Sequence, residues 1–202
     1  ATKLTQPSDL RGKKVGIYPG SVTVNEFKAF LQVNGLSEAD MTVQSISGAD
    51  IPLLKSNQVD AVLHYWEMSP VAVDVDASLP IAGGRRASDM RLADFGVKGY
   101  GLNVVANKAA FQRDRAFLTA IANAIFEGYR RACADPDAAV AAFLKEFPDK
   151  DPAYVKKSFA RVAQLVAGNY GNQTSGGWDE TISVYKKLGL LKTPVAPKDL
   201  MP

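Results

Sequence analysis

The sequence predicts an α/β fold, with a parallel-dominated sheet in the first half and a helical segment after it. Short apolar runs alternate with helical patterns over the first 108 residues, and the period turns helical after Asn107. The 202 residues are 47% hydrophobic and 22% charged, which is typical of a globular protein of one or two domains. We therefore expect an α/β region at residues 9–108 and a helical segment at residues 109–202.

The strongest local pattern is a strand, a turn and a helix near the N-terminus. Residues 14–18 form an apolar run, and Pro19, Gly20 and Ser21 follow it as a turn. The spacing of Thr23 and Glu26 is that of a capping box, which predicts a helix beginning near Thr23. That helix should end at Asn34 and Gly35.

Further elements follow from the same signals. Strands are predicted at residues 41–46, 59–66 and 101–106, with a weak one at 79–81 before a turn at 83–86. Short helices are predicted from Asp50 to about residue 57 and from Ser69 and Pro70 onward. After Asn107, helices should follow Asp114, Asp135 and Asp151; a Gly-rich loop at 168–177, a last helix at 178–188 and an extended tail complete the chain.

Composition excludes several classes of function. The net charge is +3 and no basic cluster exceeds two residues, so we expect no nucleic-acid partner. No apolar run approaches the roughly 20 residues that cross a bilayer. With Cys133 as the one cysteine and His64 as the one histidine, neither an internal disulfide nor a Cys/His metal site can form. A base beside a nucleophile, a phosphate loop and a dinucleotide motif are all missing, so we expect no enzyme and no cofactor.

Ligand binding has better support, because ligands of open parallel sheets bind beyond the carboxyl ends of the strands. One such end carries Tyr18, Gly20, Ser21, Val22 and Thr23, where a glycine and a helix N-terminus suit a hydrogen-bond acceptor or an anion. An ordinary βα turn is the alternative interpretation. If Glu26 lies in the first helical turn, its negative charge weighs against a strongly anionic ligand.

A second strand end carries Trp66 and Glu67, directly after His64 and Tyr65. Aromatic faces beside one carboxylate suit a flat, nitrogen-bearing or cationic ligand. The alternative is that an aromatic ring here belongs to the core and that Glu67 is a solvated cap. Tyr100, between two glycines, is a third candidate wall of the site or else a simple turn residue.

Four stretches in order resemble a known family, the ABC-importer solute-binding proteins of the thiamine-pyrimidine-precursor, alkanesulfonate and nitrate type. The resemblance lies in residues 9–21, in 59–67, in 95–107, and in 177–180 with 188–191. It implies a type II periplasmic-binding-protein fold, in which two α/β lobes close on a small-molecule solute and deliver it to ABC permease subunits. It also implies a periplasmic or lipid-anchored location.

In that family the loop of Gly20 to Thr23 and the loop of Trp66 and Glu67 would line the cleft on the second lobe. The chain resembles the family from the start of that second lobe onward, so we expect self-association or pairing with a first lobe. Trp66, Glu67 and the position of Glu26 favour a pyrimidine-like solute. The alternatives are a sulfonate- or nitrate-type anion and a non-transport effector-binding domain.

Overall fold

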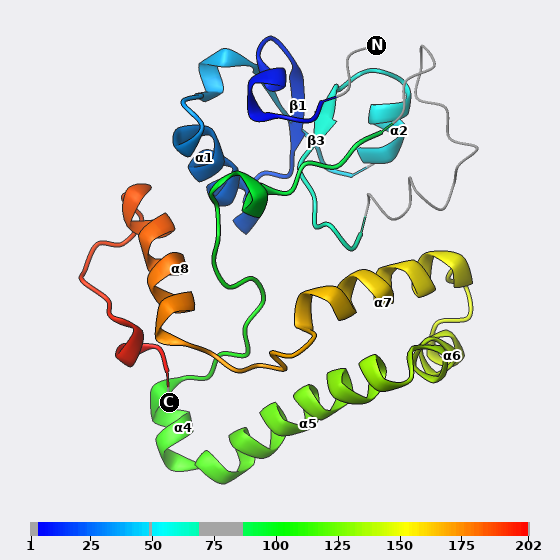
Figure 1. Ribbon diagram of the computed structural model, residues 1–202, viewed down its shortest axis with the longest axis vertical. Coiled ribbons are helices and arrows are strands. Elements are labelled where there is room, and N and C mark those ends of the chain that lie inside the picture. The colour runs from blue at the N-terminus through cyan, green and yellow to red at the C-terminus, as the bar shows by residue number, and fades with distance from the viewer. Residues whose placement is uncertain (1–3, 49, 69–86, 202) are drawn as a thin grey trace. The chain divides into compact units, whose positions relative to one another are not determined.

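The computed structural model describes residues 4–48, 50–68 and 87–201 (Figure 1). These form two compact units, the first of residues 1–99 with 175–202 and the second of residues 100–174. The sequence predicted a different boundary, between residues 108 and 109. That boundary stays a prediction. The elements predicted at Ser69 and Pro70, at 79–81 and at 83–86 lie outside the described residues.

Unit 1 is built on a three-stranded parallel sheet in the order β2-β1-β3. The strands are β1 (Lys14–Ile17), β2 (Thr42–Ser45) and β3 (Ala61–Val62). Helices α1 (Val22–Val33) and α2 (Asp50–Lys55) connect them, and Figure 1 shows these helices on opposite sides of the strands. Such an arrangement follows from two right-handed crossovers that run in opposite directions along the sheet, from β1 to β2 and then from β2 past β1 to β3. The α/β fold with a parallel sheet is thus confirmed.

The core of unit 1 lies between the sheet and α1. Alternation places Val15 and Ile17 of β1 on the face that Phe27 and Phe30 of α1 cover. Phe30 has no exposed surface and meets Phe95 edge-on, at 6.1 Å between ring centroids. Phe95 ends the 3-10 helix η3 (Leu92–Phe95), which packs on α1. The core therefore joins residues that lie on both sides of the undescribed segment.

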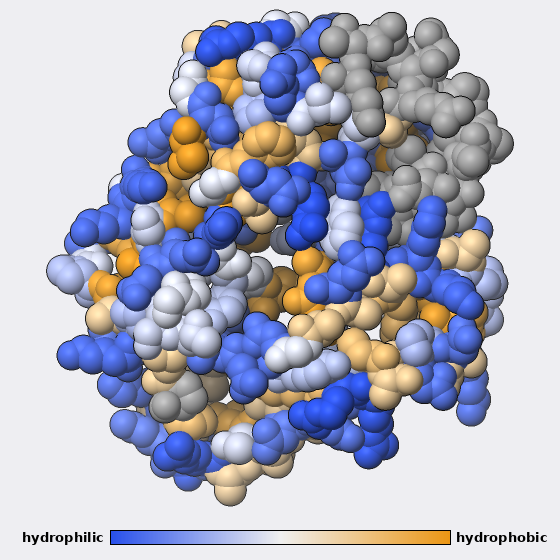
Figure 2. Space-filling model, in the orientation of Figure 1, coloured by the Kyte–Doolittle hydropathy of each residue, from blue (hydrophilic) through white to orange (hydrophobic). Residues whose placement is uncertain are grey.

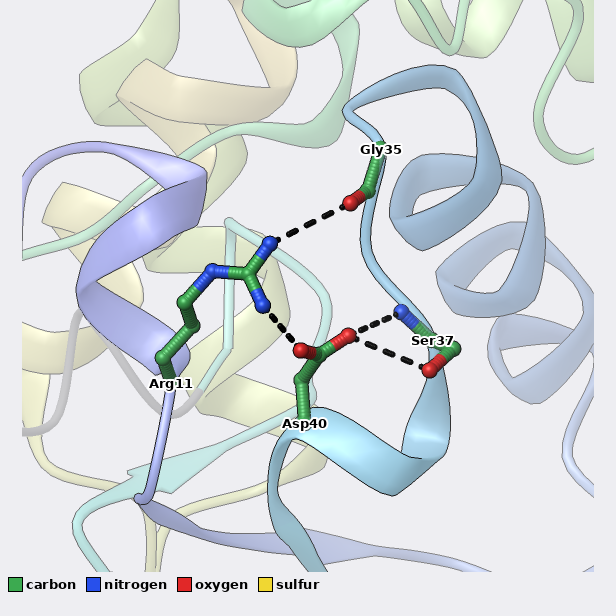
Figure 3. A network of polar contacts seen from close by, with 4 residues as sticks. All are labelled: Arg11, Gly35, Ser37 and Asp40. Carbon is green, nitrogen blue, oxygen red and sulfur yellow. Dashed lines mark hydrogen bonds and ion pairs between the residues drawn. The ribbon is translucent and has the colours of Figure 1, made fainter.

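The amino edge of the sheet is held by a polar network (Figure 3). Asp40 accepts hydrogen bonds from the backbone N–H and the hydroxyl of Ser37, at 2.8 and 3.1 Å. Arg11 pairs with the same carboxylate and donates to the carbonyl of Gly35 at 3.3 Å. The Ser37 hydrogen bonds, and then the Arg11 charge, hold the pKa of Asp40 below its ordinary value. This network fixes the starts of β1 and β2, at the end opposite their carboxyl termini.

Unit 2 is helical. It contains α4 (Lys108–Arg113), α5 (Arg115–Ala134), α6 (Pro136–Glu146) and α7 (Pro152–Val166). Asp114, Asp135 and Asp151 cap α5, α6 and α7 through their side chains, as the sequence predicts. Proline is the first residue of α6 and α7, where its missing N–H costs nothing.

The last part of the chain returns to unit 1. Helix α8 (Ser175–Lys187) packs on α1 and on the 3-10 helix η4 (Pro197–Asp199). It begins three residues before the predicted start and ends at Lys187, two residues before Gly189, which has a positive φ. Two 3-10 helices, η1 (Pro7–Leu10) and η2 (Glu38–Asp40), precede β1 and β2.

Two strand predictions were wrong. The strand predicted at residues 59–66 is much shorter, and the one predicted at 101–106 does not form. β3 has two residues in place of eight: it pairs with Val15 and Gly16 of β1, and the hydrogen bond from Leu63 N–H to the carbonyl of Gly16, at 3.0 Å, follows its last residue. Residues 101–106 form no strand, and Leu102 and Val105 are 89% and 85% exposed. A strand needs a partner for its backbone groups, and no described strand pairs with this segment.

Apolar residues also reach the surface. Figure 2 shows hydrophobic groups scattered among hydrophilic ones on the face drawn. On α5 the predicted apolar row, four residues apart, is exposed: Phe117, Ile121, Ile125 and Tyr129. The neighbouring row, one residue further along and about 100° around the helix, carries the half-buried Leu118, Ala122 and Phe126. Helix α5 therefore has two adjacent apolar rows, of which one is half-buried and the other is exposed. No helix of the described chain is long and apolar enough to cross a membrane.

Candidate functional site

The carboxyl end of the central strand opens into a tight turn. Ser21 N–H donates to the carbonyl of Tyr18 at 3.2 Å, with Pro19 and Gly20 between them. Gly20 has φ +78°, the value that the third residue of a type II turn requires. A side chain at this position would be strained, so the turn explains why proline and glycine stand here in this order.

Ser21 then caps α1, in place of the Thr23 cap that the sequence predicted. The Ser21 hydroxyl accepts the backbone N–H of Thr23 at 3.3 Å and lies 2.8 Å from the Thr23 hydroxyl. Val22 is the first helical residue and is 55% exposed, whereas Thr23 is buried. The helix therefore begins two residues earlier than a cap at Thr23 would place it, and its first turn contains no acidic residue.

The shift of the cap changes the meaning of Glu26. With Val22 as the first helical position, Glu26 is the fifth, so it is no part of a capping box. Its carboxylate is half-buried, and burial raises the pKa of Glu26. Tyr185 of α8 lies close enough that Glu26 contributes to the raised pKa of that phenol, after burial. The expectation that Glu26 lies in the first helical turn was wrong.

The loops after β1 and β3 meet through Tyr18 and His64. The two rings pack edge to face, with centroids 5.9 Å apart. His64 Nε2 lies 3.4 Å from a carboxylate oxygen of Asp50, the first residue of α2. The Tyr18 hydroxyl also hydrogen-bonds to Asp50; burial first, and then this carboxylate, raise the pKa of Tyr18. Tyr18, Asp50 and His64 thus form one half-buried polar cluster at the carboxyl edge of the sheet.

Trp66 is held by residues that follow the undescribed segment. Its ring N–H donates to Asp89 at 2.7 Å, and the guanidinium of Arg91 lies over the ring at 4.5 Å from the centroid. Glu67 follows in the turn that closes with Met68 N–H on the carbonyl of Tyr65, at 3.1 Å. One face of the Trp66 ring is therefore occupied by a cation from the protein itself.

Tyr100 lies in unit 2, apart from the other predicted site residues, which belong to unit 1. Its hydroxyl accepts the backbone N–H of Thr174 at 2.7 Å. These are the first and last residues of unit 2. The interpretation of Tyr100 as a ligand contact stays a prediction. In the structure, its hydrogen bond with Thr174 joins the two ends of unit 2.

Sequence reasoning did not select Asp50, Asp89 or Arg91 as site residues, and it gave His64 little weight. Asp50 carries only the pattern of a helix start. Asp89 and Arg91 follow no predicted strand, so no spacing marks them. His64 was discounted because side chains alternate along a strand, but β3 ends at Val62 and alternation does not extend to His64. In the described part of the chain, no cluster of His, Cys, Asp and Glu could hold a metal ion.

A protein-family model described as "NMT1/THI5 like" matches residues 1–139, more than half of the chain. The chain belongs to the NMT1/THI5-like family. The match includes the turn at Gly20, the cap at Ser21 and the loop of Trp66, so the candidate site lies within the part that the family model describes. No curated protein matches the chain by sequence.

Among solved structures, this family member is similar to the alkanesulfonate-binding protein SsuA from Xanthomonas axonopodis pv. citri, solved with MOPS bound. The TM-score is 0.62 and the sequence identity is 19%. The match covers 98% of this chain and 65% of that protein, so the chain spans about two thirds of the length of this relative. The likeness confirms the predicted α/β fold of a periplasmic binding protein.

Proposed function

We propose that this chain binds a small organic anion, of the sulfonate type, as part of the solute-binding component of an ABC importer. The observation that carries the proposal is the N-terminus of α1. It follows the central strand, it is capped by the uncharged Ser21, and its first turn holds no acidic residue. Thr23 N–H already donates to the Ser21 hydroxyl, so the attraction for negative charge comes from the positive end of the helix dipole. We expect no catalytic step, no cofactor and no nucleic-acid partner.

Two further facts support an anion. The positive φ of Gly20 brings the backbone to the strand end without a side chain in the way. The similar alkanesulfonate-binding protein was solved with MOPS, which carries a sulfonate. A transport role would require ABC permease subunits as partners and a location outside the inner membrane, in the periplasm or on a lipid anchor.

A pyrimidine-like heterocycle is the second candidate solute. The rings of Tyr18 and His64 pack together in the loops after β1 and β3, and Trp66 and Glu67 follow His64 in the chain. Rings and a carboxylate suit a flat ligand with N–H groups. This candidate comes second to the anion for two reasons. The cation of Arg91 lies over Trp66, and Glu26 lies outside the first turn of α1.

Calorimetric titration of the purified chain with an alkanesulfonate, nitrate and a 4-aminopyrimidine separates the candidates. The proposal expects the sulfonate to bind more tightly than the aminopyrimidine, and Glu67→Gln to leave sulfonate affinity unchanged. Tighter binding of the aminopyrimidine, lost in Trp66→Ala and Glu67→Gln, would make the heterocycle the solute. Binding of none of the three would contradict both.

The exposed row on α5 supports a proposed partner surface. Phe117, Ile121, Ile125 and Tyr129 are between 39% and 59% exposed. An apolar row of this length on one helix is costly to leave in water. We propose that a second copy of the chain or a first lobe covers it.

A further inference from the structure

The most specific polar arrangement at the strand ends is that of the His64 ring. Its Nδ1 accepts the backbone N–H of Tyr65 at 2.9 Å. Its Nε2 lies 3.4 Å from a carboxylate oxygen of Asp50. The side chains of His64 and Asp50 are only 16% and 14% exposed. Each ring nitrogen therefore has its own partner in a largely buried setting.

These two contacts fix the tautomer. A nitrogen that accepts a hydrogen bond carries no proton, so in neutral His64 the proton is on Nε2, the nitrogen that lies 3.4 Å from Asp50. The lone pair of Nδ1 is the only place where the ring can take up a second proton. Once protonated there, His64 Nδ1–H and Tyr65 N–H are two donors that face each other, and their hydrogen bond is lost.

Tyr65 is the residue through which this loss would spread. The carbonyl of Tyr65 accepts Met68 N–H at 3.1 Å and so closes the turn that carries Trp66 and Glu67. The backbone at Tyr65 would have to rotate to move its N–H away from the protonated Nδ1 of His64. This rotation would also move the Tyr65 carbonyl, with which the turn begins. The neutral form of His64 and the present position of the turn therefore depend on each other.

We propose that His64 is a positioning residue, whose neutral, Nε2-protonated ring holds the turn of Trp66 and Glu67 and whose protonation releases it. The titratable groups that the described structure places against the ring are Asp50 from α2, Tyr18 from the end of β1, and Tyr65 beside it. Asp50 presents a carboxylate to Nε2, and Tyr65 presents its N–H to Nδ1. The consequence for solute binding rests on the proposed function; the release of the turn does not.

The test is an NMR titration of the isotope-labelled chain over the range in which histidines change charge. We expect the Nε2–H tautomer at high pH, and we expect the Tyr65 amide and the Trp66 indole N–H to shift with the same midpoint as the His64 ring. An Nδ1–H tautomer, or a Tyr65 amide that does not follow the ring, would overturn the proposal.

Two variants replace the imidazole ring by an amide and test the Nδ1 contact and the Nε2 contact one at a time. His64→Asn keeps an acceptor near the position of Nδ1, and His64→Gln keeps a donor near the position of Nε2. In His64→Asn we expect the Trp66 signal to stay where it is in the neutral protein and to lose its pH dependence. In His64→Gln we expect it to resemble the protonated protein at every pH. Equal spectra of the two variants would contradict a role for the Nδ1 contact.

Solute titrations distinguish this inference from the proposed function. If the Trp66 signal follows His64 and no solute binds, the proposed function fails and the positioning role holds. If a solute binds and the affinity of His64→Asn changes with pH as much as that of the native chain, the positioning role fails. We expect the pH dependence that His64 adds to be up to about tenfold in affinity, the value of one hydrogen bond.

Discussion

The hydroxyl of Tyr100 accepts the backbone N–H of Thr174 at 2.7 Å, and these two residues begin and end unit 2. The segments on either side of them are also joined, since Gln173 donates to the side chain of Asn103 at 3.3 Å. The chain thus leaves unit 1 and re-enters it through two neighbouring segments, which a side-chain hydrogen bond ties together.

Tyr100→Phe tests this closure. The variant keeps the ring and removes the hydroxyl that accepts Thr174 N–H. We expect unit 2 to become less stable by about 1 kcal/mol. Hydrogen exchange of the α5 and α7 amides would measure the loss, with Tyr129→Phe as a control on an exposed ring. If Tyr100→Phe instead weakened solute binding and left hydrogen exchange in unit 2 unchanged, Tyr100 would be a ligand contact. Its hydrogen bond with Thr174 would then not stabilise unit 2.

The cap of α1 provides a second prediction. Ser21→Ala removes the hydroxyl that accepts Thr23 N–H, and we expect a loss of about 1 kcal/mol in urea unfolding. Thr23→Val keeps the volume of a buried side chain and leaves the cap in place, so it should cost less. A larger loss in Thr23→Val than in Ser21→Ala would mean that Thr23 is the cap after all.

Gly16 tests the packing on the second face of the sheet. A Cβ there would lie 3.3 Å from two side-chain atoms of Ile46 and 3.4 Å from Val62. Gly16→Val should therefore destabilise unit 1 by about 1–3 kcal/mol through overpacking. Gly128→Ala in α5 is the control, because nothing lies within 4 Å of its added Cβ. This control should stabilise the helix by about 0.5–1 kcal/mol, and equal effects of the two changes would contradict the packing described.

The network of Asp40 predicts an acid-sensitive contribution to stability. Its pKa is held below the ordinary 3.8 in the folded chain, chiefly by the Ser37 hydrogen bonds. The contribution is therefore fully present above 3.8 and is lost as the pH falls through the lower, folded value. Asp40→Asn should be less stable than the native chain at neutral pH, and the difference should shrink in acid. A difference that stays constant down to acid pH, in denaturant titrations, would exclude a role for this charge.

The exposed row on α5 predicts association. Replacing Ile121 and Ile125 by Gln should reduce self-association and dye binding, as measured by sedimentation and fluorescence, and should change unfolding free energy by less than about 1 kcal/mol. Leu165→Gln, on a residue of α7 that is 50% exposed, is the matched control. A native chain that is monomeric and binds no dye would contradict the predicted surface.

Local signals predicted most of the helices and two strands, because their causes lie within a few residues. Asp135 with Pro136 and Asp151 with Pro152 start helices through a side-chain cap and a fixed φ, and neither needs the rest of the fold. The strand at residues 101–106 was predicted wrongly for the opposite reason. Its apolar composition is that of a strand, but a strand also needs a neighbour that composition does not specify.

The candidate site was predicted at its strand ends and missed in its details. The turn of Pro19 and Gly20 has a local cause, and it lies where it was expected. The cap was misplaced by two residues, since Ser21 and Thr23 are both good caps and only the backbone decides between them. The contacts of Asp50, Asp89 and Arg91 join distant parts of the chain, and no pattern along the sequence marks them.

The most direct test of the proposed function is an NMR titration of the labelled chain with a simple alkanesulfonate, followed at the backbone amides of residues 21–24. We predict that these amides shift together and saturably, and that Ser21→Ala leaves the site anion-binding but weaker. A solute that shifts the Trp66 and Glu67 amides while those of residues 21–24 stay unchanged would contradict the account of α1 as the anion site.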